Sequence, residues 1–312
     1  MNEAVQLEAA QIVMPGLNYD APIHTPVEWD NGTWSIQHWL ERTAWKTLKD
    51  TKYGRNQQES FIPDLLEDPL LRQVYMLDVA LFIAAEKTSA DAVAGMMKIA
   101  PDEQSFLYLA TQVLDESRHH ESFCRRMADF GVTPEERKQL VTQYTTPGMR
   151  KMFDLILEQV DKGDFYAASL AQNLVLEGMA YPLYRYEIRY WSKIDPNLSK
   201  IIKVAFADEA HHVGFGEAIA SHRLKSTDVD KRNQFQKLMH DFSSLMQDTF
   251  DQVIHHYVGL YQVCADNHMD VMGDIDIFPG IKMRDVSEED QIRLLLKDIE
   301  DEHSQRLARI GL

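Results

Sequence analysis

Cysteine is scarce in this sequence, with only Cys124 and Cys264 among 312 residues. The two residues form no Cys-x-x-Cys pair of the kind that binds zinc or exchanges disulfides. So few thiols are typical of proteins that work in a reducing cytosol. The sequence therefore offers no thiolate metal site, and its fold does not depend on a disulfide framework.

Basic residues and long apolar runs are also in short supply. The chain has 32 lysines and arginines against 49 aspartates and glutamates, a net charge of −17. This balance argues against a nucleic acid or an anionic membrane as partner. No apolar run reaches the roughly 20 residues that a membrane-spanning helix needs. The first residues lack the basic flank and apolar core of a secretory signal, so we expect a cytoplasmic protein.

No strand-rich region is found, and apolar residues recur at helical spacing through most of the chain. Residues 1–32 contain three prolines and two glycines and are expected to form an extended arm. Residues 33–312 are predicted to form one all-α domain. Its helices are predicted at about 33–51, 68–99, 102–130, 164–191, 196–224, 228–268 and 287–309, with shorter pieces within 134–162 and an irregular stretch at 273–280. Pro182 should kink or divide the helix that contains it.

Two copies of the sequence Asp-Glu-x-x-His, which begin at Asp115 and Asp208, stand out in the helical regions. Within each copy the glutamate and the histidine are three residues apart and share one helix face, so that both can hold the same metal ion. One isolated glutamate precedes each copy inside another apolar helix. The six predicted metal ligands are Glu86, Glu116, His119, Glu177, Glu209 and His212.

An isolated carboxylate in an apolar helix needs a partner, because burying an unpaired charge is very costly. For Glu86 the two solutions are metal ligation and a salt bridge to Lys87 or Arg118. The repeated order favours metal ligation, since two such helix pairs would join into a four-helix bundle with the metals between them. Asp115 and Asp208 could each hydrogen-bond to the histidine of the opposite half and fix its tautomer. Surface aspartates are the alternative.

The chemistry of the ligands indicates which metals are bound. Carboxylates and imidazoles suit iron or manganese, whereas zinc more often takes thiolates or three histidines. We predict two iron ions, or one manganese and one iron ion, with coordination positions left open for O2 and substrate. Tyr181 lies one turn after Glu177 and is the candidate catalytic residue, because its phenol could donate a hydrogen bond or an electron. The alternative for Tyr181 is a core tyrosine bonded to a carbonyl.

At these residues the sequence resembles the ferritin-like dinuclear carboxylate oxidases and oxygenases, over about residues 65–225. Residues 115–119 look like the Asp-Glu-x-Arg-His repeat of the bacterial multicomponent monooxygenases. Residues 177–179 look like the Glu-Gly-Met stretch of the ligand-binding oxidases related to the ribonucleotide reductase small subunit. The resemblance implies a ferritin-like four-helix bundle with additional N- and C-terminal helices.

The sequence also departs from each of these subfamilies. Phe123 stands where ribonucleotide reductase small subunits usually place a radical tyrosine. Ser89 and Gln172 occupy the positions of the valine–tyrosine cross-link of the ligand-binding oxidases. Ala205 replaces the additional histidine ligand of the arylamine N-oxygenases, and Tyr181 replaces a threonine of the monooxygenases. No subfamily pattern is complete.

The predicted function is that of an O2-activating dinuclear metal oxidase or oxygenase that acts on a small organic substrate. A ferredoxin or a reductase is the expected electron donor, and a homodimer is left open. One alternative is a radical-generating subunit for a partner enzyme, which Phe123 disfavours. The others are a non-catalytic, ferritin-like iron-storage protein and a purely structural bundle with ion-paired glutamates.

Overall fold

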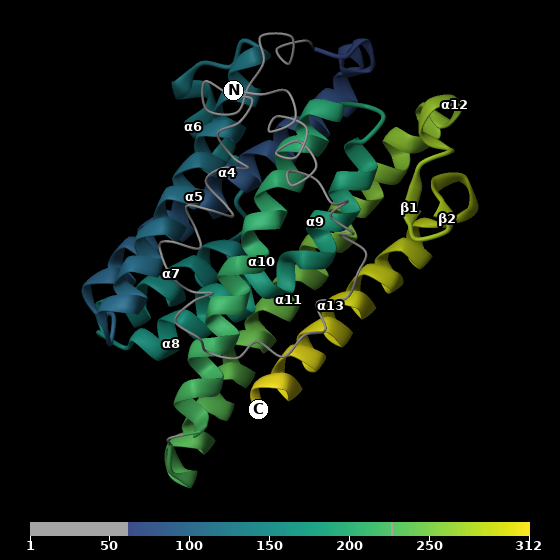
Figure 1. The fold of residues 1–312 in the computed structure, drawn as a ribbon. Coiled ribbons are helices and arrows are strands. Elements are labelled where there is room, and N and C mark those ends of the chain that lie inside the picture. The colour runs from purple at the N-terminus through teal and green to yellow at the C-terminus, as the bar shows by residue number, and fades with distance from the viewer. Residues whose placement is uncertain (1–61, 226) are drawn as a thin grey trace, which may run out of the picture.

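The structure is a computed structural model that describes residues 62–225 and 227–312. The predicted arm at 1–32 and the helix predicted from Thr33 lie outside the described residues. The rest is helical, as predicted, apart from one short hairpin (Figure 1). The predicted all-α fold class is confirmed.

Four long helical segments carry the predicted ligands, and they form a bundle (Figure 1). The segments are α4 (Pro69–Lys98), α5 (Glu103–Asp129), the continuous run of α8 (Phe165–Ser169), η4 (Leu170–Glu177) and α9 (Gly178–Trp191), and α10 (Pro196–Lys225). Helix α4 packs along α5, α9 packs along α10, and α10 also contacts α5. The two helix pairs therefore face each other, as the repeat in the sequence predicts.

The starts of the bundle helices are fixed by local chemistry. The Asp68 side chain accepts a hydrogen bond from the Leu70 amide at 2.8 Å, and Pro69 occupies the first position of α4. Asp102 caps α5 in the same way, through the Ser105 amide at 2.7 Å. Such caps satisfy amides that have no partner inside the helix, and proline suits the first turn.

The third bundle segment departs from the predicted single helix. Pro182 lies inside α9 and does not divide it. The change of helix type comes earlier, at the eight-residue π-helix η4, which ends at Glu177. In an α-helix, residues five apart point about 140° away from each other. The i→i+5 hydrogen bonding of a π-helix brings them closer to one face, and Gln172 accordingly contacts Glu177.

The remaining elements surround the bundle. They are η3 (Asp64–Glu67), α6 (Pro134–Tyr144), α7 (Pro147–Asp161), α11 (Val229–Asn267), α12 (Met269–Met272), β1 (Asp276–Phe278), β2 (Ile281–Lys282), η5 (Met283–Asp285) and α13 (Glu288–Ile310). Helix α11 packs against α7 and α13, and α13 contacts α9 and α10. The antiparallel β1–β2 hairpin replaces the irregular stretch expected at 273–280, and Gly280 adopts a φ of 72° between its strands.

A buried polar network connects three of the bundle helices at one end. The Arg126 guanidinium on α5 donates to the Asp195 carboxylate at 2.7 Å, just before α10 begins. Tyr75 on α4 donates its hydroxyl to the same carboxylate at 2.7 Å. All three residues are fully buried. Because each charge and hydroxyl has a partner, the network can lie inside the core without an uncompensated polar group.

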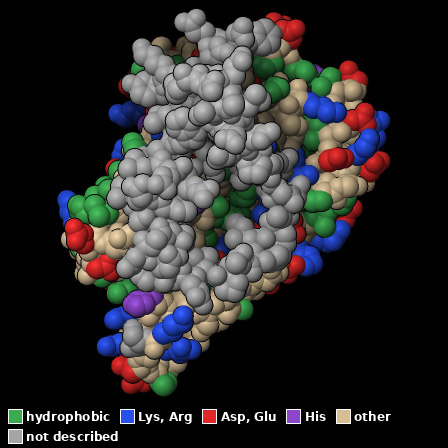
Figure 2. Space-filling view, viewed as in Figure 1, with side chains coloured by type: hydrophobic (Ala, Val, Ile, Leu, Met, Phe, Trp, Pro, Cys, Tyr) green, Lys and Arg blue, Asp and Glu red, His purple; other side chains and the backbone are tan. Residues whose placement is uncertain are grey.

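On the face shown in Figure 2, the acidic and basic side chains of the described residues are interspersed, without one large patch of either sign among those that are visible. None of the helices within the described ranges is long and apolar enough to cross a membrane.

Candidate metal centre

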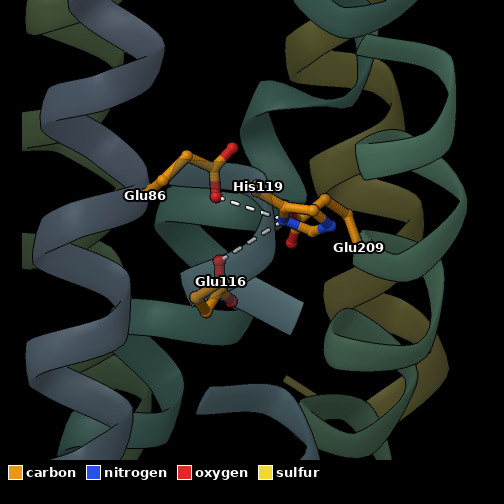
Figure 3. Close-up of side chains that lie close together, drawn as sticks. All are labelled: Glu86, Glu116, His119 and Glu209. Atoms are coloured by element: carbon orange, nitrogen blue, oxygen red, sulfur yellow. Dashed lines mark hydrogen bonds and ion pairs between the residues drawn. The ribbon is translucent and has the colours of Figure 1, made fainter. Parts of the chain in front are cut away.

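All six predicted ligands meet in the middle of the bundle, and each is at most 5% exposed. They form two overlapping groups in which the potential ligand atoms lie within 4.8 Å of one another. The first group is Glu86, Glu116, His119 and Glu209, and the second is Glu116, Glu177, Glu209 and His212. Figure 3 shows the Glu86 and Glu116 carboxylates directed at the His119 ring, with Glu209 beside it. Glu116 and Glu209 belong to both groups, so each of them could contact two metal ions.

The two histidines present the same ring nitrogen to the centre. His119 Nδ1 lies 3.2 Å from Glu86 Oε2 and 3.5 Å from Glu209 Oε1. His212 Nδ1 lies 3.2 Å from Glu116 Oε1 and 3.0 Å from Glu209 Oε2. Nδ1 is therefore the atom of each ring that could bind a metal, and Nε2 points outwards.

Each outward Nε2 faces the aspartate of the opposite half. His119 Nε2 lies 3.2 Å from Asp208 Oδ2, and His212 Nε2 lies 3.6 Å from Asp115 Oδ2. Asp115 and Asp208 are 3% and 7% exposed, so they are not surface aspartates. Burial opposes the ionisation of Asp208, but its hydrogen bond with His119 and the charge of Arg118 hold its pKa at about 2. Asp208 can thus keep His119 in the tautomer that leaves Nδ1 free for metal. The buried His212 Nε2 has no hydrogen-bond partner among the described residues, and Asp115 lies just beyond hydrogen-bond distance from it.

We expect Asp115→Asn and Asp208→Asn to weaken metal binding by about 10- to 100-fold while the fold is kept. The amide preserves the shape of the side chain but removes the charge that fixes and polarises the ring. Dissociation constants from metal titration would measure the effect. Wild-type affinity in both variants would show that the aspartates do not support the ligands.

The charges around the centre fit two divalent cations. Lys87 forms an ion pair with Asp91, and Arg118 forms ion pairs with Asp208 and Asp115. Neither therefore forms the salt bridge to Glu86 that was the alternative to metal ligation. Across residues 62–225 and 227–312, no lysine or arginine forms a salt bridge with any of the four glutamates. The only possible cationic partners in these ranges are the two imidazoles: burial opposes their protonation, but the glutamates raise the pKa of His119 and of His212 in the metal-free site. Two divalent ions would supply four units of positive charge to the four buried carboxylates.

Burial also makes the metal-free site hold protons. It raises the pKa of Glu86 to about 8 and raises the pKa of Glu177 and of Glu209. A metal must displace these protons, so we expect metal affinity to increase from about pH 6 to pH 8. Calorimetric titration in buffers with different ionisation enthalpies would count the protons released. An affinity that does not change with pH would contradict protonation of the empty site.

Sequence reasoning missed a group of amides that surrounds Glu177. Gln112 and Gln172 donate to Glu177 Oε1 at 2.9 and 3.0 Å, and Asn173 donates to Oε2 at 3.0 Å. Gln172 also donates to Ser89 at 2.7 Å. Ser89 and Gln172, which occupy the positions of the valine–tyrosine cross-link of the ligand-binding oxidases, are thus joined by a hydrogen bond. These three donors fix the orientation of the Glu177 carboxylate, as outer-shell hydrogen bonds do for carboxylates that bind metals.

The structure places a different tyrosine at the centre from the one expected. Tyr181 donates its hydroxyl to the backbone carbonyl of Glu209 at 2.8 Å, which is the alternative that the sequence left open. Tyr184 instead donates to Glu86 Oε1 at 3.4 Å. On an α-helix, the position four after Glu177 is turned by about 40° and the position seven after it by about −20°. Tyr184 therefore projects from nearly the same face as Glu177.

We expect Tyr184→Phe to alter the reaction and Tyr181→Phe to alter only stability. Each change removes one hydroxyl and keeps the ring, at a cost of about 1 kcal/mol in unfolding free energy. Tyr184 contacts the carboxylate of a predicted ligand, whereas Tyr181 contacts only the backbone of one, so only the loss of the Tyr184 hydroxyl should change the rate of O2 consumption at full metal occupancy. Equal rates in both variants would remove Tyr184 from the mechanism.

A helical bundle with a Glu from each of two segments and a Glu-x-x-His from each of the other two defines the class of ferritin-like dinuclear carboxylate proteins. The comparisons with known proteins agree. The family described as "Ribonucleotide reductase, small chain" matches residues 68–268, and the chain belongs to this family.

The solved structures that resemble this one share its fold. An R2-like ligand-binding oxidase from Sulfolobus acidocaldarius is 15% identical, with 90% of this chain and 91% of that chain covered and a TM-score of 0.61. Two point mutants of an R2-like ligand-binding oxidase carry a Mn/Fe cofactor reconstituted aerobically and anaerobically. Each is 14% identical, with 96% of this chain and 97% of that chain covered, and the TM-scores are 0.62 and 0.64. No curated protein matches the chain.

Proposed function

We propose that this protein binds two metal ions, iron with iron or manganese with iron, and uses O2 to oxidise or oxygenate a small organic substrate. The observation that carries the proposal is the pair of overlapping buried ligand groups. Glu86 and His119 would hold one ion, Glu177 and His212 would hold the other, and the two glutamates common to both groups would bridge them. The Mn/Fe cofactors of proteins with this fold support the choice of metals.

The residues around the centre favour an enzyme over a store for iron. A cavity of about 120 Å³ adjoins the predicted ligands Glu86, Glu177 and Glu209. An apolar cavity of roughly 150 Å³ accommodates benzene, so the space suits a small organic molecule. The metal pair, when bound, supplies electrons to O2. The protein contributes the ligand geometry, the Tyr184 hydrogen bond to Glu86 and the exclusion of water by the stacked Phe82 and Phe123 rings.

The proposal is tested by elemental analysis of the full-length protein expressed with iron and manganese both supplied. We expect about two metal ions per chain and O2 consumption that depends on substrate. Protein that stays metal-free would refute the metal site. Metal-loaded protein that takes up O2 without any substrate dependence would favour iron storage or radical generation. For the latter, Phe123 is fully buried and offers no phenol at that position.

A further inference from the structure

The cavity beside the metal centre has a second acidic region away from the predicted ligands. Asp78 and Glu187 both line it. Asp78 lies on α4, eight residues before Glu86, and Glu187 lies on α9, ten residues after Glu177. At 1.5 Å per residue, these separations correspond to about 12 and 15 Å along the helices. The cavity thus extends from the metal centre to a distinct pair of carboxyl groups, between walls of leucine, phenylalanine, valine and isoleucine side chains.

The two carboxyl groups have no cationic partner within the described ranges. Asp78 is 2% exposed and accepts hydrogen bonds from Trp191 Nε1 at 2.9 Å and from the Tyr261 hydroxyl. The Oε2 atom of Glu187 is buried and has no hydrogen-bond partner in the described part of the chain. The described residues that line the cavity include no lysine, arginine or histidine. A buried, unpartnered carboxylate oxygen is costly unless something else satisfies it.

The pKa values of Asp78 and Glu187 are consistent with a site that lacks a cation. Burial raises the pKa of Asp78 to about 7. Burial, and then the charge of Asp78, raises the pKa of Glu187 well above its usual range. The ion pairs at the metal centre do not extend to this region, and two bound divalent ions would balance only the four ligand glutamates. A cation between Asp78 and Glu187 would favour the charged form of both.

Aromatic rings complete the acidic end. Tyr186, Tyr257 and Tyr261 line the same cavity, and the rings of Tyr186 and Tyr261 stack with their centroids 5.8 Å apart. The charges of Asp78 and Glu187 raise the pKa of Tyr257, after the larger effect of burial, so its phenol also lies near both acids. Carboxylates together with aromatic faces are the chemistry that binds ammonium groups.

We propose that Asp78 and Glu187 form a subsite for the protonated amino group of the substrate, whose apolar body extends along the cavity to the metal centre. The substrate class is thus an amine with an apolar chain. That this amine is oxidised, and not only bound, rests on the proposed function. The binding step itself needs no metal. The separation of about 12 Å along α4 sets how far from the nitrogen the reacting atom lies.

The experiment compares three probes with the same apolar chain, short enough for a cavity of about 120 Å³: n-butylamine, n-butanol and butanoate. Their affinities are measured by calorimetry on the full-length protein, both metal-free and metal-loaded without O2. We expect butylamine to bind about 10- to 100-fold more tightly than butanol, because hydrogen bonds to charged groups are the strong ones, and butanoate to bind most weakly.

Glu187→Gln tests the subsite directly, since it removes one charge at nearly constant volume. We expect the preference for the amine over the alcohol to fall to about twofold, with the affinity for butanol unchanged. Glu302→Gln is the matched control, because it removes the same charge from an ion pair with Arg185 outside this cavity. Glu187→Met provides a second variant, and the melting temperature of each shows that it is folded. An amine preference that survives loss of the Glu187 charge, or equal binding of amine and alcohol by wild type, would overturn the proposal.

The outcomes also separate this proposal from the proposed function. An amine preference in a protein that never takes up metal would leave the subsite in place and refute the oxidase. Two bound metals and substrate-dependent O2 consumption without an amine preference would support the oxidase and refute the amine subsite.

Discussion

Glu209→Ala is expected to abolish binding of both metal ions, whereas Glu86→Ala is expected to leave one ion bound. Glu209 belongs to both ligand groups, and Glu86 belongs to only one. Glu116→Ala should behave like Glu209→Ala, and His212→Ala like Glu86→Ala. Elemental analysis would therefore give about zero metals per chain for the first pair and about one for the second. O2-dependent turnover should be lost in all four, because the reaction needs both ions.

Loss of metal in the Glu209 variant should not reflect unfolding. Burial and the charge of Glu116 raise the pKa of Glu209, so its removal relieves a crowded acidic core when no metal is present. The melting temperature of metal-free Glu209→Ala should thus equal or exceed that of metal-free wild type. Glu121→Ala, which removes an exposed glutamate paired with Arg125, is the control that should retain both ions. Full metal occupancy in the Glu209 or Glu116 variant would contradict the proposal that these two glutamates bridge the ions.

Much of the bundle was predictable from local signals. The helices that carry Glu86 and Glu116 begin and end within two residues of their predicted bounds. An aspartate cap marks each start, and a first-turn proline also marks the start of α4; such signals act within a few residues of the chain. The Glu-x-x-His spacing was equally informative, because a fixed helical period determines which side chains share a face.

The π-helix and the tyrosine that reaches the site were not predictable in this way. Helix propensity does not distinguish hydrogen bonds to the fourth residue from those to the fifth, so the sequence of η4 resembles that of an ordinary α-helix. Gly216 shows what the tertiary packing requires, since a Cβ atom there would lie 2.6 Å from Asn173 Cβ. This close approach of α10 to η4 depends on residues more than 40 positions apart.

The amides and the cavity depend on still longer-range contacts. Gln112 reaches Glu177 from another helix, 65 residues away, and no spacing rule connects the two. The acidic end of the cavity combines Asp78 with Tyr261, which are 183 residues apart. Single residues of these types occur throughout the chain, so only the folded structure shows which of them meet.

Arg126→Met is expected to lower the free energy of unfolding by about 3–5 kcal/mol, the usual result of breaking a buried ion pair from one side. The variant would leave the Asp195 carboxylate, which is fully buried, with only the Tyr75 hydroxyl at Oδ2. Methionine roughly fills the space of the aliphatic part of arginine, so the loss would be mainly electrostatic. Equilibrium unfolding in urea, with the slope compared with that of wild type, measures it.

Two further variants separate the buried charge from other effects of the substitution. Arg125→Met changes the neighbouring arginine, whose pair with the exposed Glu121 should contribute at most about 1 kcal/mol. Asp195→Asn added to Arg126→Met neutralises the stranded carboxylate. Its amide oxygen can still accept from the Asn197 amide at the start of α10, and its NH2 group can donate to the Tyr75 hydroxyl oxygen, which Arg126 no longer contacts. We expect the double variant to recover more than half of the lost stability. If it is no more stable than Arg126→Met alone, packing of the arginine against Phe130, rather than the uncompensated charge, holds this end of the bundle together.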